Sequence, residues 1–198
     1  ALMRGEEVEV PVFDFLTGRR AKDSIVMRLH PDEPLIIEGI HALNPMLLND
    51  DIDRDKLFRV YVSALTTLNI DDHNRIHTTD ARLLRRLVRD YETRGASMEH
   101  TLSMWPSVRR GEEKWIFPYQ ENADALFNTT LVYEVSVLKK YVYPLLQEVP
   151  KESPCYAAAR DITKVLNYFL DADGIEDEIP PTSILREFIG GCTFYRKD

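Results

Sequence analysis

The chain of 198 residues has few cysteines and no long apolar run. Cys155 and Cys192 are its only cysteines, which are too few for a disulfide framework or a thiolate metal site. No apolar run reaches the roughly 18 residues that cross a bilayer, and no signal-peptide pattern opens the chain. We therefore expect a cytoplasmic protein with no membrane partner.

Positive charge is also in short supply. The 25 lysines and arginines are outnumbered by 33 aspartates and glutamates, which leaves a formal net charge of -8. A general nucleic-acid binder usually carries a basic surplus, so nucleic acid is an unlikely partner. Hydrophobic residues make up 44% of the chain, which is ordinary for a globular protein with one main core.

Against this acidic background, arginines gather in the stretch from Asp80 to Asp90. At about 100° per residue of helix, they fall within a quarter to a third of the circumference. These residues are Arg82, Arg85, Arg86 and Arg89. The opposite, apolar side of the same helix is expected to pack inward and consists of Leu83, Leu84, Leu87, Val88 and Tyr91.

The arginine face has two interpretations. Guanidinium groups match phosphate oxygens in pairs, so the face is suited to a polyphosphate. Alternatively, it is a solvated helix face neutralised by nearby carboxylates such as Asp80, Asp90 and Glu92. The helix alone does not decide between them.

A second feature is the apolar run Leu35–Ile37, followed by Glu38 and Gly39. This pattern predicts a buried parallel strand that ends in a carboxylate, as in the Walker-B arrangement. Such a carboxylate helps to hold the magnesium ion of a bound nucleotide.

Strands alternating with helices predict an α/β fold with a mostly parallel sheet flanked by helices. The segment Ala1–Gly5 is typical of the end of a helix, so we expect the chain to be the C-terminal part of a longer one. We expect strands at 8–15, 24–29, 35–37, 57–62 and 125–127. We expect helices at 41–48, 79–94, 97–113, within 131–147, 155–170 and 182–190, with Thr79 and Ser97 as N-caps and Pro106 as a kink or break.

Several separate motifs, in one order, resemble the uridine kinase and phosphoribulokinase branch of the P-loop kinases. The resemblance runs from about Leu2 to Phe127. It rests on the segments 10–15, 37–41, 80–90, 94–95, 117–118 and 123–124. Segments 62–73 and 181–191 are similar to a subgroup in which such a domain follows a TGS module and a segment like the second additional domain of threonyl-tRNA synthetase.

The resemblance implies a P-loop-type nucleoside kinase that uses ATP and Mg²⁺ and acts on a small-molecule acceptor. Glu38 would be the carboxylate associated with the metal ion. Arg86, Arg89 and Arg94 would face the transferring phosphoryl group as catalytic residues. Arg82 and Arg85 would help to bind the nucleotide, and Asp14 would shape the acceptor pocket. Asp80 would orient or cap the arginine helix.

The sequence also departs from that family. The glycine-rich phosphate loop G-x-x-x-x-G-K-[ST] is absent from these residues, as is the catalytic-base aspartate. Polar residues expected to read uridine are replaced, which puts pyrimidine specificity in doubt. The substituted acceptor-site positions are Phe13, Gly18, Ala96 and Met104. We expect the chain alone to have no kinase activity.

Two functions therefore remain open. One is part of a nucleoside kinase; the other is a degenerate kinase fold serving as a regulatory or RNA- and translation-associated binding module. In either case we expect the kinase-like part at 1–150, with lid helices at about 79–114, and a helical extension at 151–198 that packs on it. A homo-oligomer is possible. His73 and His77 are better explained by a polar helix entry than by a metal site.

Overall fold

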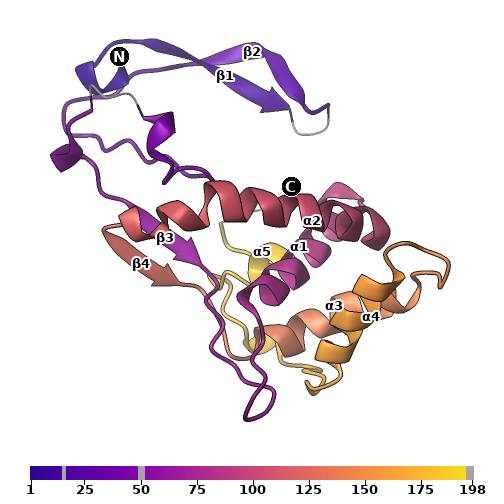
Figure 1. Ribbon diagram of the computed structural model, residues 1–198. Coiled ribbons are helices and arrows are strands. Elements are labelled where there is room, and N and C mark those ends of the chain that lie inside the picture. The colour runs from indigo at the N-terminus through magenta and orange to yellow at the C-terminus, as the bar shows by residue number, and fades with distance from the viewer. Residues whose placement is uncertain (15–16, 49–51, 195–198) are drawn as a thin grey trace. The chain divides into compact units, whose positions relative to one another are not determined.

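A computed structural model describes residues 1–14, 17–48 and 52–194 (Figure 1). The chain divides into two compact units, Ala1–Ala42 and Leu43–Asp198. The architecture is α/β, with a parallel pair of strands flanked by helices, as the sequence predicts.

The first unit is built on an antiparallel hairpin. A 3-10 turn, η1 (Leu2–Arg4), precedes strand β1 (Val8–Asp14), which pairs with strand β2 (Arg19–Met27). The register changes between Pro11 and Phe13, as expected where a proline inside a strand cannot donate a hydrogen bond to its neighbour. Both predicted strands therefore exist, although the second begins earlier than the sequence predicts.

The predicted strand at Leu35–Ile37 is wrong. These residues have no regular structure, and Ile36 and Ile37 are 85% and 63% exposed. A buried parallel strand needs neighbouring strands for its backbone groups, and no described strand pairs with this segment. The predicted helix at 41–48 is also wrong, because only the 3-10 turn η2 (Pro45–Leu47) forms there, capped by Asn44, whose Oδ1 accepts from the Met46 amide at 3.0 Å.

In the second unit, two short strands pair in parallel. After the 3-10 turn η3 (Arg54–Lys56), strand β3 (Val60–Ser63) runs beside strand β4 (Ala125–Asn128) in register from Val60–Ala125 to Ser63–Asn128. Tyr61 and Ser63 are buried, whereas Val60 and Val62 are exposed. The sequence correctly predicts both strands, but β3 is shorter than 57–62 and is buried on one face only.

The arginine stretch lies on helix α1 (Thr78–Arg94), which is followed by helix α2 (Met98–Trp115). Gly95 ends α1 in the left-handed conformation, at φ 61°, as predicted. Ser97 caps α2 as predicted, because its Oγ accepts the His100 amide at 3.1 Å. His77, rather than the predicted Thr79, is the N-cap of α1, and α2 continues past Pro106 without a break.

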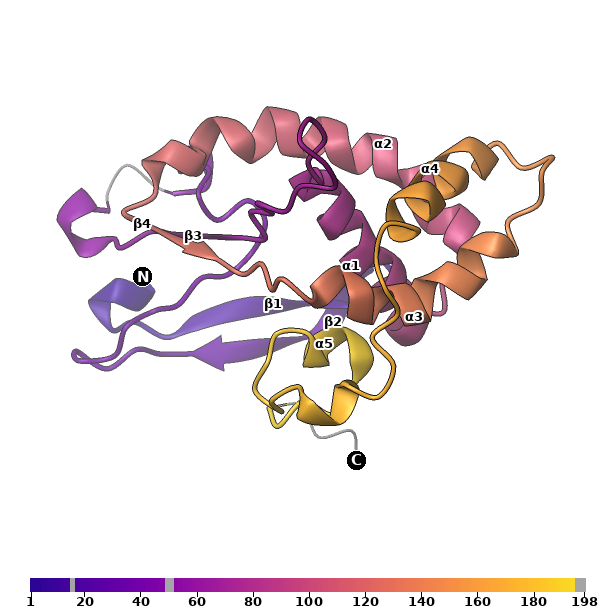
Figure 2. The same ribbon diagram turned by 90° about the horizontal axis from the view of Figure 1, so that it is seen from below.

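The remaining helices complete the second unit. A 3-10 segment, η4 (Phe117–Asn122), leads into β4, and helix α3 (Glu134–Gln147) follows that strand. Helix α4 (Tyr156–Leu166), the turn η5 (Glu176–Glu178) and the short helix α5 (Arg186–Ile189) close the described chain. Helix α4 packs on α3, and α5 packs on α1 (Figure 2).

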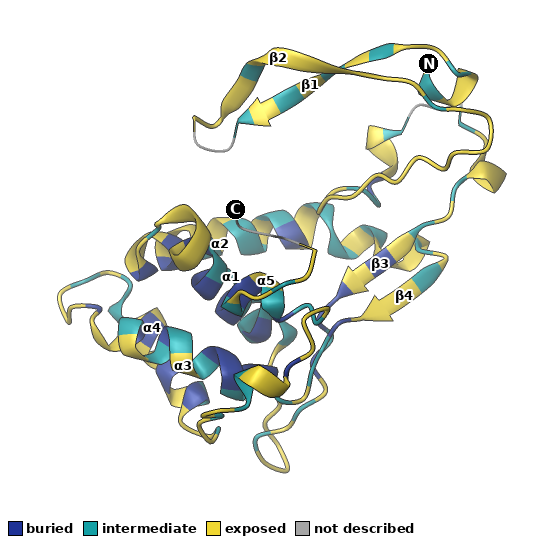
Figure 3. Cartoon of the chain, turned by 180° about the vertical axis from the view of Figure 1, so that it is seen from behind, coloured by how far each residue is buried: buried dark blue, intermediate teal, exposed yellow. Residues whose placement is uncertain are grey.

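The core lies among these helices, where Figure 3 shows the buried residues of α1, α3, α4 and α5 facing one another. Leu84, Leu87, Leu138, Leu166 and Leu185 are almost fully buried within it. Residues 151–194 thus contribute to the same core as α1 and α3. No helix in the described part of the chain is long and apolar enough to cross a membrane.

Candidate functional site

Helix α1 has the two faces that its sequence predicts. Leu83, Leu84, Leu87 and Val88 are buried in the core. Tyr91 was also expected to pack inward, but it is 43% exposed, so that expectation is wrong. At about 100° per residue, Tyr91 falls between Leu87 and Leu84 on the helix circumference, so the helical period alone places it on the buried face; it lies in the last turn of α1, next to the helix end at Arg94.

The first part of the arginine face pairs with buried glutamates. Arg82 Nη2 lies 2.8 Å from Glu112 Oε1, and its Nε donates to the same oxygen at 3.0 Å. Arg109 Nη1 donates to the other oxygen of Glu112 at 2.7 Å. Glu112 therefore joins α2 to α1 through Arg82, while Arg109 of its own helix binds its other oxygen.

Arg85 is held more completely. Its Nη2 donates to Glu134 Oε2 at 2.6 Å and to the Thr129 carbonyl oxygen at 2.9 Å, while Nη1 donates to Thr129 Oγ1 at 3.2 Å. Its Nε donates to Glu134 Oε1, and the side chain is only 12% exposed. This guanidinium group ties α1 to α3, and the predicted nucleotide-binding role of Arg82 and Arg85 stays a prediction.

The other two arginines of that face, together with Arg94 in the last turn of α1, surround a single carboxylate, Asp90, which is 5% exposed. Arg94 Nη1 donates to Asp90 Oδ1 at 2.9 Å. Arg86 Nε lies 3.1 Å from Oδ2, and Arg89 Nε lies 3.9 Å from Oδ1. Thr101 Oγ1 on α2 donates to Oδ2 at 3.4 Å. We call Arg86, Arg89 and Arg94 the shared trio.

The shared trio has more positive charge than Asp90 can neutralise. Three guanidinium groups meet one buried carboxylate, which leaves two positive charges before the neighbouring Glu187 is counted. The Nε atoms of Arg86 and Arg89 are buried and form no hydrogen bond with any described residue. A cluster with surplus charge and unsatisfied donors has the chemistry of an anion site.

A segment near the C-terminus reaches the same helix. Arg89 Nη1 lies 3.6 Å from Glu187 Oε1, and the guanidinium carbon of Arg85 lies 5.7 Å from the ring centre of Phe188. The sequence pattern did not indicate Glu112, Glu134 and Glu187 as partners of the arginines. Among the ion pairs of these arginines, the sequence could indicate Arg86–Asp90 and Asp90–Arg94, because residues four positions apart on a helix are neighbours. The three glutamates lie 30 or more residues from their α1 arginines, so the sequence pattern could not indicate them.

Of the predicted acceptor-site residues, Ala96 lies between α1 and α2, and Met104 lies on α2. Ala96 donates its amide to the Asp90 carbonyl oxygen at 3.0 Å, so it belongs to the same helix end as Arg94. Met104 is exposed. Both side chains are apolar, and neither supplies a polar contact to a base.

The other predicted site residues lie in the first unit. Asp14 ends β1 and accepts the Thr17 hydroxyl at 2.7 Å and the Thr17 amide at 3.4 Å. Gly18, at φ 65°, permits the turn that follows, and Phe13 is half exposed. Phe15, the last residue of the strand predicted at 8–15, lies outside the described residues.

Glu38 is exposed and lies on a segment without regular structure, so the predicted position at the end of a central strand is wrong. Within the described residues, no group of three or more histidine, cysteine, aspartate or glutamate side chains is arranged to hold a metal ion. Magnesium is commonly held by one or two carboxylates together with substrate phosphates and water, so a lone Glu38 fits it only alongside a nucleotide.

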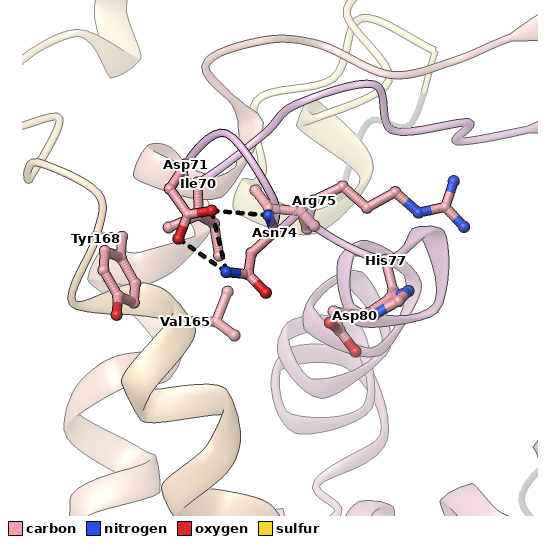
Figure 4. A pocket seen from close by; sticks show the side chains of 9 residues that line it. Ile70, Asp71, Asn74, Arg75, His77, Asp80, Val165 and Tyr168 are labelled. Carbon is pink, nitrogen blue, oxygen red and sulfur yellow. Dashed lines mark hydrogen bonds between the residues drawn. The ribbon is translucent and has the colours of Figure 1, made fainter.

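A separate pocket lies at the beginning of α1, between the loop 70–76 and the end of α4 (Figure 4). Asp71 closes the loop, because its Oδ1 accepts the amides of His73 and Asn74 at 2.8 Å and its Oδ2 accepts Asn74 Nδ2 at 2.8 Å. These hydrogen bonds lower the pKa of Asp71, with the Asn74 side chain contributing most. Asp80 lines the same pocket, and burial raises the pKa of its carboxyl group. This is the polar helix entry expected for Asp71–His77.

Comparison with known proteins identifies relatives and a family. The chain is 32% identical over 126 residues to the uridine kinase of Staphylococcus epidermidis and, over the same length, to that of Staphylococcus aureus. The match covers 63% of this chain and 52% of each relative, so the chain spans about half the length of the curated relatives it matches. The phosphoribulokinase / uridine kinase family matches residues 1–136, and the chain belongs to that family.

Proposed function

We propose that this chain supplies the arginine-rich part of a nucleoside kinase of the uridine kinase type. The whole protein would transfer the γ-phosphoryl group of ATP to a hydroxyl group of a small acceptor. The observation that carries the proposal is the shared trio, in which Arg86, Arg89 and Arg94 surround one buried carboxylate and keep surplus positive charge. Membership of the family supports it independently.

In this proposal the residues of α1 act by placement and charge. Asp90 draws three flexible side chains toward one position, and their remaining donors are available to phosphate oxygens. When negative charge develops on the oxygens of a transferring phosphoryl group, guanidinium groups already in place stabilise it without reorganisation. Glu112 and Glu134 keep the helix itself in position through Arg82 and Arg85.

ATP and Mg²⁺ belong to the proposal as the donor and its metal ion. The shared trio fits a polyphosphate by its surplus positive charge. Magnesium would neutralise charge on the phosphates, and Glu38 is the carboxylate that the family resemblance assigns to it. These residues contain no glycine-rich phosphate loop, so we propose that the chain alone transfers no phosphoryl group. A cytoplasmic location and a homo-oligomer remain predictions.

The acceptor is proposed only as a small hydroxyl compound. Phe13, Gly18, Ala96 and Met104 offer no side-chain hydrogen bonds with which to recognise uridine. The alternative is a degenerate kinase fold that binds a ligand without catalysing phosphoryl transfer. The loss of polar side chains at the same four positions favours it.

The experiment is a screen of the whole protein with labelled ATP against nucleosides and other small alcohols. We expect transfer to at least one acceptor, and we expect Arg89→Ala to lower kcat by a larger factor than it raises the KM for that acceptor. Binding of ATP without transfer to any acceptor would favour the binding module. An active Arg89→Ala variant with unchanged kcat would remove the shared trio from the mechanism.

A further inference from the structure

The segment Pro181–Gly191, which we call the C-terminal arm, contacts the arginine helix at the shared trio. It includes α5 and the exposed carboxylate of Glu187. We propose that Glu187 is an internal competitor for the anion site, so that the C-terminal arm lowers the affinity of Arg89 for phosphate until a ligand displaces the carboxylate. The inference rests on the proposed phosphate-binding role of the shared trio.

The contact itself has the properties of an exchangeable pair. Arg89 Nη1 and Glu187 Oε1 are 3.6 Å apart, and both side chains remain partly exposed to solvent. Arg89 Nε is buried without a hydrogen bond to any described residue, so the pair leaves part of the guanidinium group unsatisfied. A polyphosphate can satisfy several donors at once, whereas this carboxylate approaches Arg89 at one atom.

The rest of the C-terminal arm is anchored independently of that pair. Phe188 is buried in the core and lies against Arg85. Arg186 Nη2 donates to the carbonyl oxygens of Glu176 at 2.5 Å and of Ile179 at 2.6 Å, and its Nη1 donates to the Gly190 carbonyl oxygen at 3.4 Å. The backbone therefore holds Glu187 next to Arg89 even when the carboxylate itself is displaced.

Two glycines allow the chain to wrap around Arg186. Gly190 and Gly191 have φ values of 84° and 75°, a region that side chains rarely adopt. A Cβ on Gly191 would lie 3.2 Å from Arg186 Nη1. A substitution at Gly191 is thus a way to loosen the C-terminal arm without changing any charge.

The expected strength of the effect is modest. Partly exposed ion pairs contribute little, so removing the competitor should tighten phosphate binding by about two- to fivefold. The carboxylate therefore tunes affinity and does not block the site.

The test measures the affinity of the full chain for tripolyphosphate by calorimetry at one fixed ionic strength. We expect Glu187→Gln to bind about two- to fivefold more tightly than wild type. The matched control is Asp161→Asn, which removes a carboxylate that pairs with Lys164 at 2.9 Å on the surface of α4, and we expect it to leave the affinity unchanged. In an Arg89→Ala background, Glu187→Gln should bring no gain.

Gly191→Ala provides a second, charge-neutral test. If the C-terminal arm positions the competitor, loosening it should also tighten tripolyphosphate binding. Binding that depends on Arg89 but is equal in wild type, Glu187→Gln and Gly191→Ala would overturn this inference and leave the proposed function intact. If Arg89→Ala binds tripolyphosphate as well as wild type does, or no folded variant binds it, this inference is overturned together with the phosphate-binding role of the shared trio. The screen of the whole protein with labelled ATP tests the kinase activity separately.

Discussion

The two parts of the arginine helix have similar sequences and opposite environments. Arg82 and Arg85 each meet a buried glutamate from another helix, and Arg85 has hydrogen-bond partners for all its nitrogen atoms. Arg86, Arg89 and Arg94 share one aspartate, and the Nε atoms of Arg86 and Arg89 form no hydrogen bond with any described residue. The arginines of one helix thus form a structural group, Arg82 and Arg85, and a candidate ligand-binding group, the shared trio. What distinguishes the two groups is that only the first is paired with buried glutamates from other helices.

The largest expected effect tests the structural group. Arg85→Ala leaves Glu134 buried and unpaired, so we expect a loss of about 3–5 kcal/mol in the free energy of unfolding, measured by urea denaturation. Replacing both partners, as in Arg85→Met with Glu134→Leu, should restore most of that loss because no charge is then left buried. If Arg85→Ala unfolds at the same urea concentration as wild type, Arg85 does not hold α1 to α3.

The next effect tests the ligand-binding group. Arg89→Ala should weaken tripolyphosphate binding about tenfold, because one charged donor of the shared trio is lost. Its free energy of unfolding should change by less than about 1 kcal/mol, because the side chain is partly exposed and its ion pairs are long. A variant with weakened folding and unchanged binding would place Arg89 in the structural group instead.

A pH-dependent effect is expected at the beginning of the same helix. Burial raises the pKa of the Asp80 carboxyl group above its ordinary value, so the folded state binds this proton more tightly than the unfolded state does. The contribution of Asp80 to stability therefore falls as the pH rises from about 4 through the raised pKa. Asp80→Asn should remove this decline in a series of thermal melts at different pH. The decline should persist in the control Asp161→Asn.

The smallest effect is expected at Arg94. Its side chain is 49% exposed, so Arg94→Ala should change the free energy of unfolding by about 0.5 kcal/mol or less in urea denaturation, in spite of the 2.9 Å ion pair with Asp90. A loss as large as that of Arg85→Ala would erase the distinction between the two groups of arginines.

Patterns with a local physical cause were predicted well. Gly95 ends α1 and Ser97 begins α2 because a left-handed glycine and a capping hydroxyl act on the adjacent turn. The buried positions of α1 followed from the helical period, except Tyr91 at the end of the stripe. The strands at 8–15 and 24–29 and the strand at 125–127 were also predicted, since their alternation or apolar character is local, whereas the antiparallel pairing of the first two was not.

The misplaced strand and the unforeseen arginine partners concern residues that lie far away in the sequence. The run Leu35–Ile37 has the composition of a buried strand, but a strand forms only where neighbours accept its backbone hydrogen bonds. The ion-pair partners of the arginines could likewise not be predicted, because Glu134 is 49 residues from Arg85 and Glu187 is 98 residues from Arg89 in the sequence.

The sequence by itself determined the family, the arginine face of α1 and the ends of that helix, because motif order, helical period and capping are properties of neighbouring residues. The tertiary structure decided which arginines are neutralised and which retain surplus charge. The charge that remains on each arginine depends on where α2, α3 and the C-terminal arm place their carboxylates. The strength of each ion pair is set by the distance between the charges and by their burial, which only the tertiary structure determines.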